Sequence, residues 1–248
     1  MTPKEMVSRL LYRDGLMLVI DKPAGFAVHK GPKGGESLED HFDVLRFGLP
    51  RAPALAHRLD RDTSGCLVLG RHRKALAMLG KLFKSGAIDK IYWAVVETGP
   101  EPDEGIIDLP LGRLDVTRGW WMKHDPRGQP AVSKWKVMGR TSSAAEHLTW
   151  LALEPVTGRT HQLRVHCAEM GWPIVGDTIY GTAPRTGGPP LHLHAREIVV
   201  PLYKNRAPIR VVAPLPPHMR ERLARCGWPG EETAPALECA GEASLNDQ

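Results

Sequence analysis

Residues 57–70 read HRLDRDTSGCLVLG, a polar loop that runs directly into an apolar segment. The segment from Gly65 to Gly70 is apolar throughout and is bounded by glycines, which is typical of a strand buried on both faces of a sheet. The loop before it contains two carboxylates, Asp60 and Asp62, next to arginines. Taken alone, such a loop could simply pair its carboxylates with its own arginines. The stretch predicts a central strand, and its loop becomes a candidate site only if other segments support it.

Secondary-structure signals on both sides of this strand mix short strands with short helices. Apolar runs predict strands, and apolar residues at helical spacing predict helices. Before the loop we expect strands over 16–20 and 26–29, on either side of a turn at 21–25, and a helix over 37–47. After it we expect a helix ending near Gly86, strands over 91–96, 147–154, 191–200 and 209–213, and helices over 160–170 and 217–226. Without regular βαβα alternation, this order favours an α+β fold with a mainly antiparallel central sheet and flanking helices.

Charge is distributed unevenly along the chain. The formal net charge is +5, but residues 229–248 contain five acidic residues and no Lys or Arg. Removing those five from the 28 acidic residues leaves 23 against 33 basic ones. We expect a single domain over residues 1–228, followed by a flexible acidic tail over 229–248. A basic body favours a polyanionic partner, and nucleic acid is the commonest one.

Several classes of protein are disfavoured by the sequence. The four cysteines lie far apart with no CxxC pair, which argues against a disulfide framework and a zinc site. His192 and His194 would share one strand face, and with His166 and Cys167 could suggest metal ligands, but no local spacing supplies a tetrahedral set, so we expect no metal site. No run of about 18 apolar residues occurs, and the charged start is unlike a signal peptide. We expect a soluble, cytoplasmic protein without membrane contact.

Four segments acquire meaning when they are considered together. They are DKPAG (21–25), HRLDRDTSG (57–65), KIYWAVV (90–96) and TGRTHQLRVH (157–166). In this order and roughly at this spacing they resemble the RluA-type pseudouridine synthases, whose signature is HRLDxxTSG. GDTIYG (176–181) and LHLHA (191–195) also look like that family, so the resemblance runs from about residue 14 to 213.

The resemblance implies the pseudouridine synthase fold, with a catalytic cleft across the sheet, and the isomerisation of a specific uridine in ribosomal or transfer RNA. It implies an RNA partner, no cofactor, no obligatory protein partner and a monomer. Two departures affect the choice of RNA. We expect no small basic RNA-binding domain ahead of the catalytic body, because barely a dozen residues precede the first strand, and Gln129 stands where Lys is frequent.

By this resemblance Asp60 is the catalytic carboxylate, because the family pattern places it after His-Arg-Leu and leaves Asp62 on a free position. A carboxylate in an apolar pocket is poorly ionised unless a cation lies beside it, and Arg164 is that cation in the family's pattern, able to hold one oxygen while orienting the other. Tyr92 can stack on the uracil and relay the C5 proton. Its strand neighbours, such as Trp93, would fill the core from the other face, although core packing is also open to Tyr92.

Four further residues are expected to hold the RNA. A stacked uridine must be extruded before its C1′ and C5 atoms can be reached. Arg58 is the candidate wedge for the vacated stack, because the Arg of HRLD does this in a resembling enzyme. Arg61, Arg159 and His161 are expected to contact phosphates near the cleft.

Some alternatives stay open at this level. A catalytically idle RNA chaperone on the same fold is one, although Asp60, Tyr92 and Arg164 are all present. A metal-dependent hydrolase or nuclease built from His57, Asp60, Asp62 and the later histidines is another. The sequence also leaves open whether Asp60 attacks C1′, attacks C6 or removes the C2′ proton.

Overall fold

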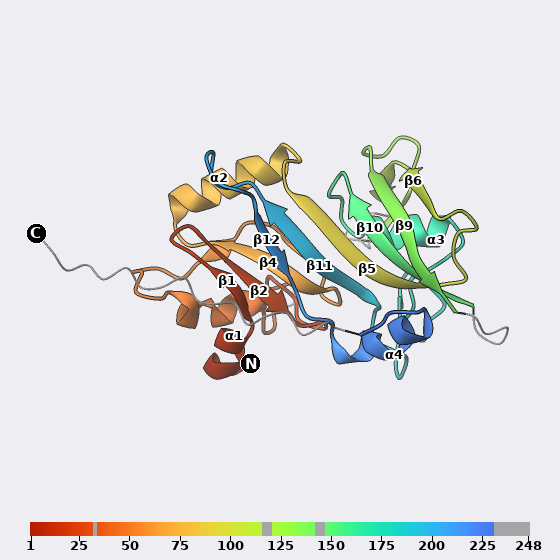
Figure 1. Cartoon of the computed structure of the whole chain (residues 1–248), viewed down its shortest axis with the longest axis horizontal. Coiled ribbons are helices and arrows are strands. Elements are labelled where there is room, and N and C mark those ends of the chain that lie inside the picture. Colours follow the sequence, from red (N-terminus) through yellow and green to blue (C-terminus); the bar gives the residue numbers. More distant parts are fainter. Residues whose placement is uncertain (32–33, 116–120, 142–146, 231–248) are drawn as a thin grey trace, which may run out of the picture.

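A computed structural model of the chain describes residues 1–31, 34–115, 121–141 and 147–230. The acidic tail predicted for 229–248 therefore lies, from residue 231 onward, outside the described residues. Within them, ten strands form one large sheet flanked by short helices (Figure 1). None of the helices described has the length and apolarity that a membrane span requires.

Eight strands follow one path across the large sheet, in the order β1-β2-β4-β11-β5-β10-β9-β6. Their bounds are β1 Leu10–Arg13, β2 Met17–Lys22, β4 Ser64–Gly70, β5 Asp89–Glu97, β6 Glu104–Asp108, β9 Val132–Arg140, β10 Leu148–Pro155 and β11 Leu193–Val200. Off this path, β3 (Ala54–Leu55) pairs with β4, and β12 (Ile209–Val212) pairs with β11. β7 (Leu111–Arg113) and β8 (Met122–His124) form a separate hairpin. Among the described pairings only β4–β11 is parallel, so the expected α+β fold with a mainly antiparallel sheet is confirmed.

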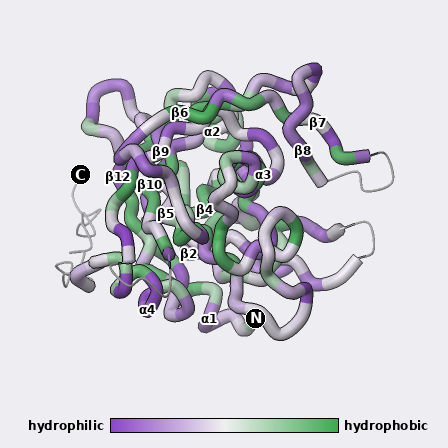
Figure 2. The backbone as a smooth tube through the Cα atoms, turned by 90° about the vertical axis from the view of Figure 1, so that its right-hand side faces the viewer, coloured by the Kyte–Doolittle hydropathy of each residue, from purple (hydrophilic) through white to green (hydrophobic). Residues whose placement is uncertain are grey.

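Helices cover both faces of the sheet. They are α1 (Pro3–Ser8), the 3-10 helix η1 (Leu38–Leu45), α2 (Arg73–Lys84), α3 (Gln162–Glu169) and α4 (Pro217–Arg225). In β4, Leu67 and Leu69 join the cluster that includes η1, whereas Cys66 and Val68 face the cluster that includes Leu79 of α2. This alternation is why the run is apolar at every position. Figure 2 shows hydrophobic residues along the central strands and hydrophilic ones in outer loops.

Two predicted elements near the N-terminus differ from the structure. Residues 26–29 form no strand, because the carbonyls of Ala27 and Val28 accept hydrogen bonds from Leu38 and Glu39 at the start of η1. The helix predicted over 37–47 is the shorter 3-10 helix η1. Ser37 and Asp40 form a capping box at its start.

One register row fixes the centre of the sheet. Ala195 of β11 lies opposite Gly65 of β4 on one side and opposite Tyr92 of β5 on the other. Gly65 has φ +104°, and a Cβ atom there would lie 2.3 Å from the Ala195 carbonyl oxygen. Only glycine allows both this backbone conformation and this approach. The last residue of the TSG motif therefore brings the loop before β4 to a fixed position relative to Tyr92.

We predict that Gly65→Ala lowers the free energy of unfolding by about 2–5 kcal/mol, from backbone strain and the clash with Ala195. Gly80 is the matched control, because it lies inside α2 with open space around its Cα. Gly80→Ala should raise the free energy of unfolding by about 0.5–1 kcal/mol. Urea denaturation of the three proteins measures both changes. A Gly65→Ala protein as stable as the parent would show that the close approach is not required.

Candidate active site

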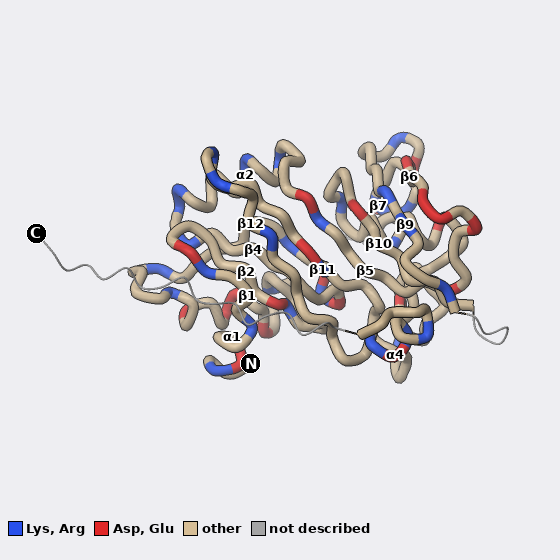
Figure 3. Tube along the Cα trace, viewed as in Figure 1, with Lys and Arg blue, Asp and Glu red and all other residues tan. Residues whose placement is uncertain are grey.

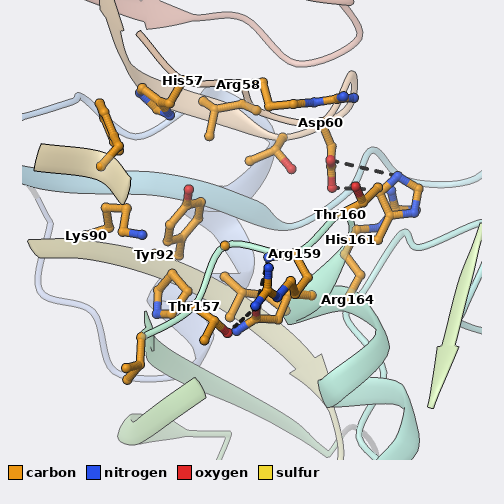
Figure 4. A pocket seen from close by; sticks show the side chains of 18 of the residues that line it. His57, Arg58, Asp60, Lys90, Tyr92, Thr157, Arg159, Thr160, His161 and Arg164 are labelled. Carbon is orange, nitrogen blue, oxygen red and sulfur yellow. Dashed lines mark hydrogen bonds and ion pairs between the residues drawn. The ribbon is translucent and has the colours of Figure 1, made fainter. Parts of the chain in front are cut away.

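A cleft of about 610 Å³ opens beside the loop that precedes β4 (Figure 4). Its lining comes from that loop, from the end of α2, from β5 and from residues 155–164. Asp60 is the one acidic side chain among the described residues that line it. The lining brings together six of the seven predicted site residues: Arg58, Asp60, Tyr92, Arg159, His161 and Arg164. Arg61 is not part of it.

Lys22, at the end of β2, anchors the loop that carries Asp60. Its side chain is fully buried, and the ammonium donates hydrogen bonds of 2.8 Å to the carbonyls of Pro23, Arg61 and Thr63. Burial lowers the pKa of Lys22 to about 7, and Asp62 and Asp60 oppose this shift. Three carbonyl acceptors need the three N–H groups that only the charged amine has. The DKPAG segment is thus more than the hairpin turn that its sequence predicts.

His57, the first residue of the signature, supports the loop from its other end. Its Nε2 accepts a hydrogen bond from the Val68 amide at 3.0 Å, and its ring stacks on Phe83. Burial lowers the pKa of His57 to about 3. The ring is therefore neutral and is engaged in holding the loop against β4 and α2. In the described part of the chain, no three His, Cys, Asp or Glu side chains are grouped to hold a metal ion.

Arg164, in α3, makes its direct hydrogen bonds to Asp177. Its Nε and Nη2 lie 2.7 and 2.8 Å from the two Asp177 oxygens. The remaining nitrogen, Nη1, lies 3.9 Å from Asp60 Oδ2. The sequence paired Arg164 with Asp60 alone, whereas the structure makes Asp60 the more distant of two carboxylates.

Asp177 is the buried counter-charge of Arg164. Both side chains are buried, with 4% of Arg164 and 1% of Asp177 exposed. Burial would raise the pKa of Asp177, but its hydrogen bonds to Arg164 and the adjacent charge outweigh this and hold the pKa below its usual value. The amides of Ile179 and Tyr180 also donate to Asp177 Oδ1. The sequence contained GDTIYG as a family-like motif but gave it no role.

Tyr92 projects from β5 into the cleft, as Figure 4 shows. Trp93 and Val95 pack into a different cluster, with Trp150. Tyr92 and Trp93 therefore lie on opposite faces as predicted, but the Tyr92 face is also part of the core, because Tyr92 packs against the clusters that include Ala94 and Leu67. Burial, and then the nearby Asp60 carboxylate, raises the pKa of Tyr92 above its usual value.

His161 is deeply placed for a residue predicted to contact phosphates. Only 8% of it is exposed, its Nδ1 lies 2.7 Å from the Tyr180 hydroxyl, and its Nε2 lies 3.8 Å from Asp60 Oδ1. Its surroundings are thus those of a neighbour of Asp60.

The three predicted RNA-contacting arginines differ in position. Arg58 is exposed at the cleft, and Arg159 lines it while its Nε donates to the Pro130 carbonyl at 3.0 Å. Arg61 is 73% exposed and donates to the Gly25 carbonyl.

Comparison with known proteins assigns the family. Residues 16–169 match the family model described as RNA pseudouridylate synthase. The chain belongs to the RluA-type RNA pseudouridine synthases. It is therefore an isomerase, and its family acts on RNA. The resemblance drawn from the four sequence segments is confirmed.

Relatives cover most of this pseudouridine synthase. An uncharacterized RNA pseudouridine synthase of Zymomonas mobilis is 41% identical over 213 residues, covering 85% of this chain and 95% of that protein. The ribosomal large subunit pseudouridine synthase C of Vibrio cholerae is 32% identical, covering 89% of this chain and 70% of that protein. The solved structure of human RNA pseudouridylate synthase domain containing 4 superposes with a TM-score of 0.75 at 27% identity, covering 91% and 95% of the two chains.

The Arg164–Asp177 pair yields a stability prediction. Arg164→Met leaves the buried Asp177 carboxylate without its cation, so the free energy of unfolding should fall by about 3–5 kcal/mol. In Arg164→Met/Asp177→Asn the buried charge is gone and the side-chain oxygen can still accept from the two amides, so most of that loss should be recovered. Chemical denaturation of both variants measures this. A double variant no more stable than Arg164→Met would contradict the pairing.

Proposed function

We propose that this enzyme isomerises a specific uridine in structured ribosomal or transfer RNA, with Asp60 as its catalytic carboxylate. The observation that carries the proposal is that Asp60 is the one carboxylate among the described lining residues of a cleft otherwise rich in Arg and Lys. Its side chain is 18% exposed, so a bound nucleotide can reach it. Asp62, in the same loop, is 46% exposed and is not part of the lining.

The reaction defines what the cleft must supply. The bond between uracil N1 and ribose C1′ breaks, the base turns, and a bond forms between C5 and C1′, while C5 loses a proton and N1 gains one. A carboxylate can begin this by attacking C1′, by attacking C6 or by removing the C2′ proton. All three routes start from an ionised carboxylate next to the nucleotide. No electrons enter or leave, so the proposal includes no cofactor.

Arg164 and Tyr92 have distinct roles in this proposal. Arg164 is held rigidly by Asp177 and turns its third nitrogen, Nη1, toward Asp60, so that a positive charge lies 3.9 Å from Oδ2. Tyr92 presents a ring that can stack on uracil. Because its pKa is raised, its hydroxyl stays protonated, and it suits a relay that gives up one proton while accepting the C5 proton.

The RNA is proposed to bind across the cleft opening. Arg58 would fill the stack vacated by the flipped uridine, and Arg61 and Arg159 would contact phosphates. α2, which ends at the cleft, carries four basic residues and no acidic one (Figure 3). The name of the Vibrio cholerae relative refers to the large ribosomal subunit, and this supports ribosomal RNA as one of the two substrate classes. We propose that the protein is cytoplasmic and is a monomer without an obligatory protein partner. Sedimentation of the purified protein tests the monomeric state.

Asp60→Asn should abolish pseudouridine formation while RNA affinity stays within a few-fold, because the amide keeps the shape but cannot act as a nucleophile or base. Asp62→Asn is the matched control in the same loop and should retain activity. Mapping pseudouridine in total RNA incubated with each variant measures this. Activity retained by Asp60→Asn and lost by Asp62→Asn would assign the chemistry to the other carboxylate.

Arg58→Ala, Arg61→Ala and Arg159→Ala test the RNA contacts. If Arg61 and Arg159 each neutralise one phosphate, their alanine variants should each reduce the slope of log affinity against log salt by about 1. Arg58→Ala should instead impair turnover on a base-paired uridine more than on one already unstacked. Equal losses on the two substrates would reject the wedge role of Arg58. Salt slopes equal to that of the parent protein would reject the phosphate contacts.

A further inference from the structure

Two groups from one short segment approach the two oxygens of Asp60. Arg164 Nη1 lies 3.9 Å from Oδ2, and His161 Nε2 lies 3.8 Å from Oδ1. His161 is the N-cap residue immediately before α3, and Arg164 lies in the first turn of that helix. Figure 4 shows both side chains directed toward Asp60. The carboxylate thus has a cationic neighbour on one oxygen and an imidazole neighbour on the other.

The backbone of His161 is held in an uncommon conformation. Its φ of 53° and ψ of 18° place it in the left-handed region, which residues other than glycine visit rarely. Such conformations persist where surrounding contacts over-determine them, and they cluster at functional sites. On its side chain, Nδ1 lies 2.7 Å from the Tyr180 hydroxyl oxygen.

The Tyr180 hydroxyl indicates which nitrogen of His161 carries the proton. Its oxygen accepts a hydrogen bond of 2.9 Å from the Met122 amide. With one lone pair already used, its own proton can be donated to His161 Nδ1, and in that arrangement the proton of a neutral ring is on Nε2. The opposite tautomer would direct the Nε2 lone pair at the anionic Asp60. Both arguments favour an Nε2–H group facing Asp60 Oδ1.

Tyr180 is itself fixed by the groups that fix Arg164. Its amide donates to Asp177 Oδ1 at 3.0 Å, and its ring lies under the Arg164 guanidinium, 5.3 Å from ring centre to Cζ. Gly176 begins this segment with φ +80°, and a Cβ atom there would lie 2.2 Å from the Pro190 carbonyl oxygen. The segment 176–180 therefore positions both neighbours of Asp60, one through Asp177 and one through Tyr180.

We propose that His161 is a positioning residue for Asp60, presenting Nε2–H to Oδ1, and that the Tyr180 hydroxyl sets its tautomer. This rests on the proposed role of Asp60. With an N–H group 3.8–3.9 Å from each oxygen, the carboxylate is oriented electrostatically toward the nucleotide. Burial lowers the pKa of His161, with Asp60 opposing the shift, which agrees with a neutral ring. A phosphate contact is disfavoured because the two ring nitrogens face Tyr180 and Asp60 and the side chain is buried.

The tautomer can be measured without any activity. Nitrogen-15 NMR of the imidazole rings, with the His161 signals assigned by their loss in His161→Gln, should show Nδ1 unprotonated and Nε2 protonated. Tyr180→Phe keeps the ring under Arg164 and removes only the hydroxyl, so the tautomer should shift away from pure Nε2–H. Tyr203→Phe is the matched control, because it removes a hydroxyl bonded to Asp14, outside the cleft lining. A proton on Nδ1, or a spectrum unaffected by Tyr180→Phe, would overturn the proposal.

Kinetics separate positioning from RNA binding. His161→Leu should lower kcat by about 10²-fold, the size seen when one preorganised hydrogen-bond donor is removed, while RNA affinity and its salt slope stay unchanged. His161→Gln, which restores an N–H at similar reach, should recover part of kcat, and Tyr180→Phe should lower kcat while leaving KM in place. Weaker RNA affinity with a lower salt slope and unchanged kcat would instead make His161 a phosphate contact.

The outcomes distinguish this inference from the proposed function. If Asp60→Asn is fully active, the proposed function fails whatever His161 does. If Asp60→Asn is inactive while His161→Leu turns over like the parent protein, only the positioning role fails. Should His161→Leu unfold, the Tyr180→Phe kinetics and the tautomer measurement decide the question by themselves.

Discussion

The contact between Gly65 and the Ala195 carbonyl is the constraint on which the arrangement of the cleft depends. It lies at the only parallel pairing among the described strands, where β4 meets β11. On its other side Ala195 is in register with Tyr92. The loop carrying Asp60 and the strand carrying Tyr92 are therefore both positioned by Ala195. Any side chain at position 65 would push these two halves of the sheet apart. The position of the cleft thus depends first on the close approach of the two backbones, and only then on the side chains that line it.

Two cationic side chains lie near Asp60, and each is held by partners other than Asp60. Arg164 is committed to Asp177, and a bidentate pair of this kind is close to neutral as a unit. Asp60 therefore lies beside a rigid, satisfied guanidinium, and it keeps some contact with solvent. Lys22 adds a second cation below the loop, bonded only to carbonyl oxygens. Both cations stay fixed by other partners while the Asp60 carboxylate is free to react.

The sequence predicted the parts of the fold whose signals are local. The apolar run from Gly65 to Gly70 predicted a strand buried on both faces, and β4 is one. The strand predicted over 26–29 was wrong because the carbonyls of Ala27 and Val28 accept hydrogen bonds from the start of η1. No sequence pattern reveals such a backbone contact. Helix α1 was overlooked although Thr2 and Glu5 form a capping box that was readable as T-x-x-E.

The candidate site residues, too, were predicted only where their sequence signals are local. Motif matching identified Asp60, Tyr92 and Arg164, which all line one cleft, because a family motif marks residues of a site that the family members share. It could not reveal that Arg164 bonds Asp177, since the two are 13 positions apart and meet only through the turn at Gly176. The sequence predicted a phosphate contact for His161, whereas its burial beside Tyr180 is a property of tertiary packing that the sequence pattern does not contain.

Both glycine contacts converge on the same strand and the residues leading into it. Gly65 abuts Ala195 within β11, and Gly176 abuts Pro190 just before it. The first contact positions the loop of Asp60, and the second positions the segment that orients Arg164 and His161 toward that carboxylate. A displacement of β11 would therefore move Asp60 and its two neighbours together instead of separating them. The three segments are more than 100 residues apart in sequence at their extremes, but all are positioned by β11. This is why the Asp60 carboxylate lies under 4 Å from His161 and Arg164.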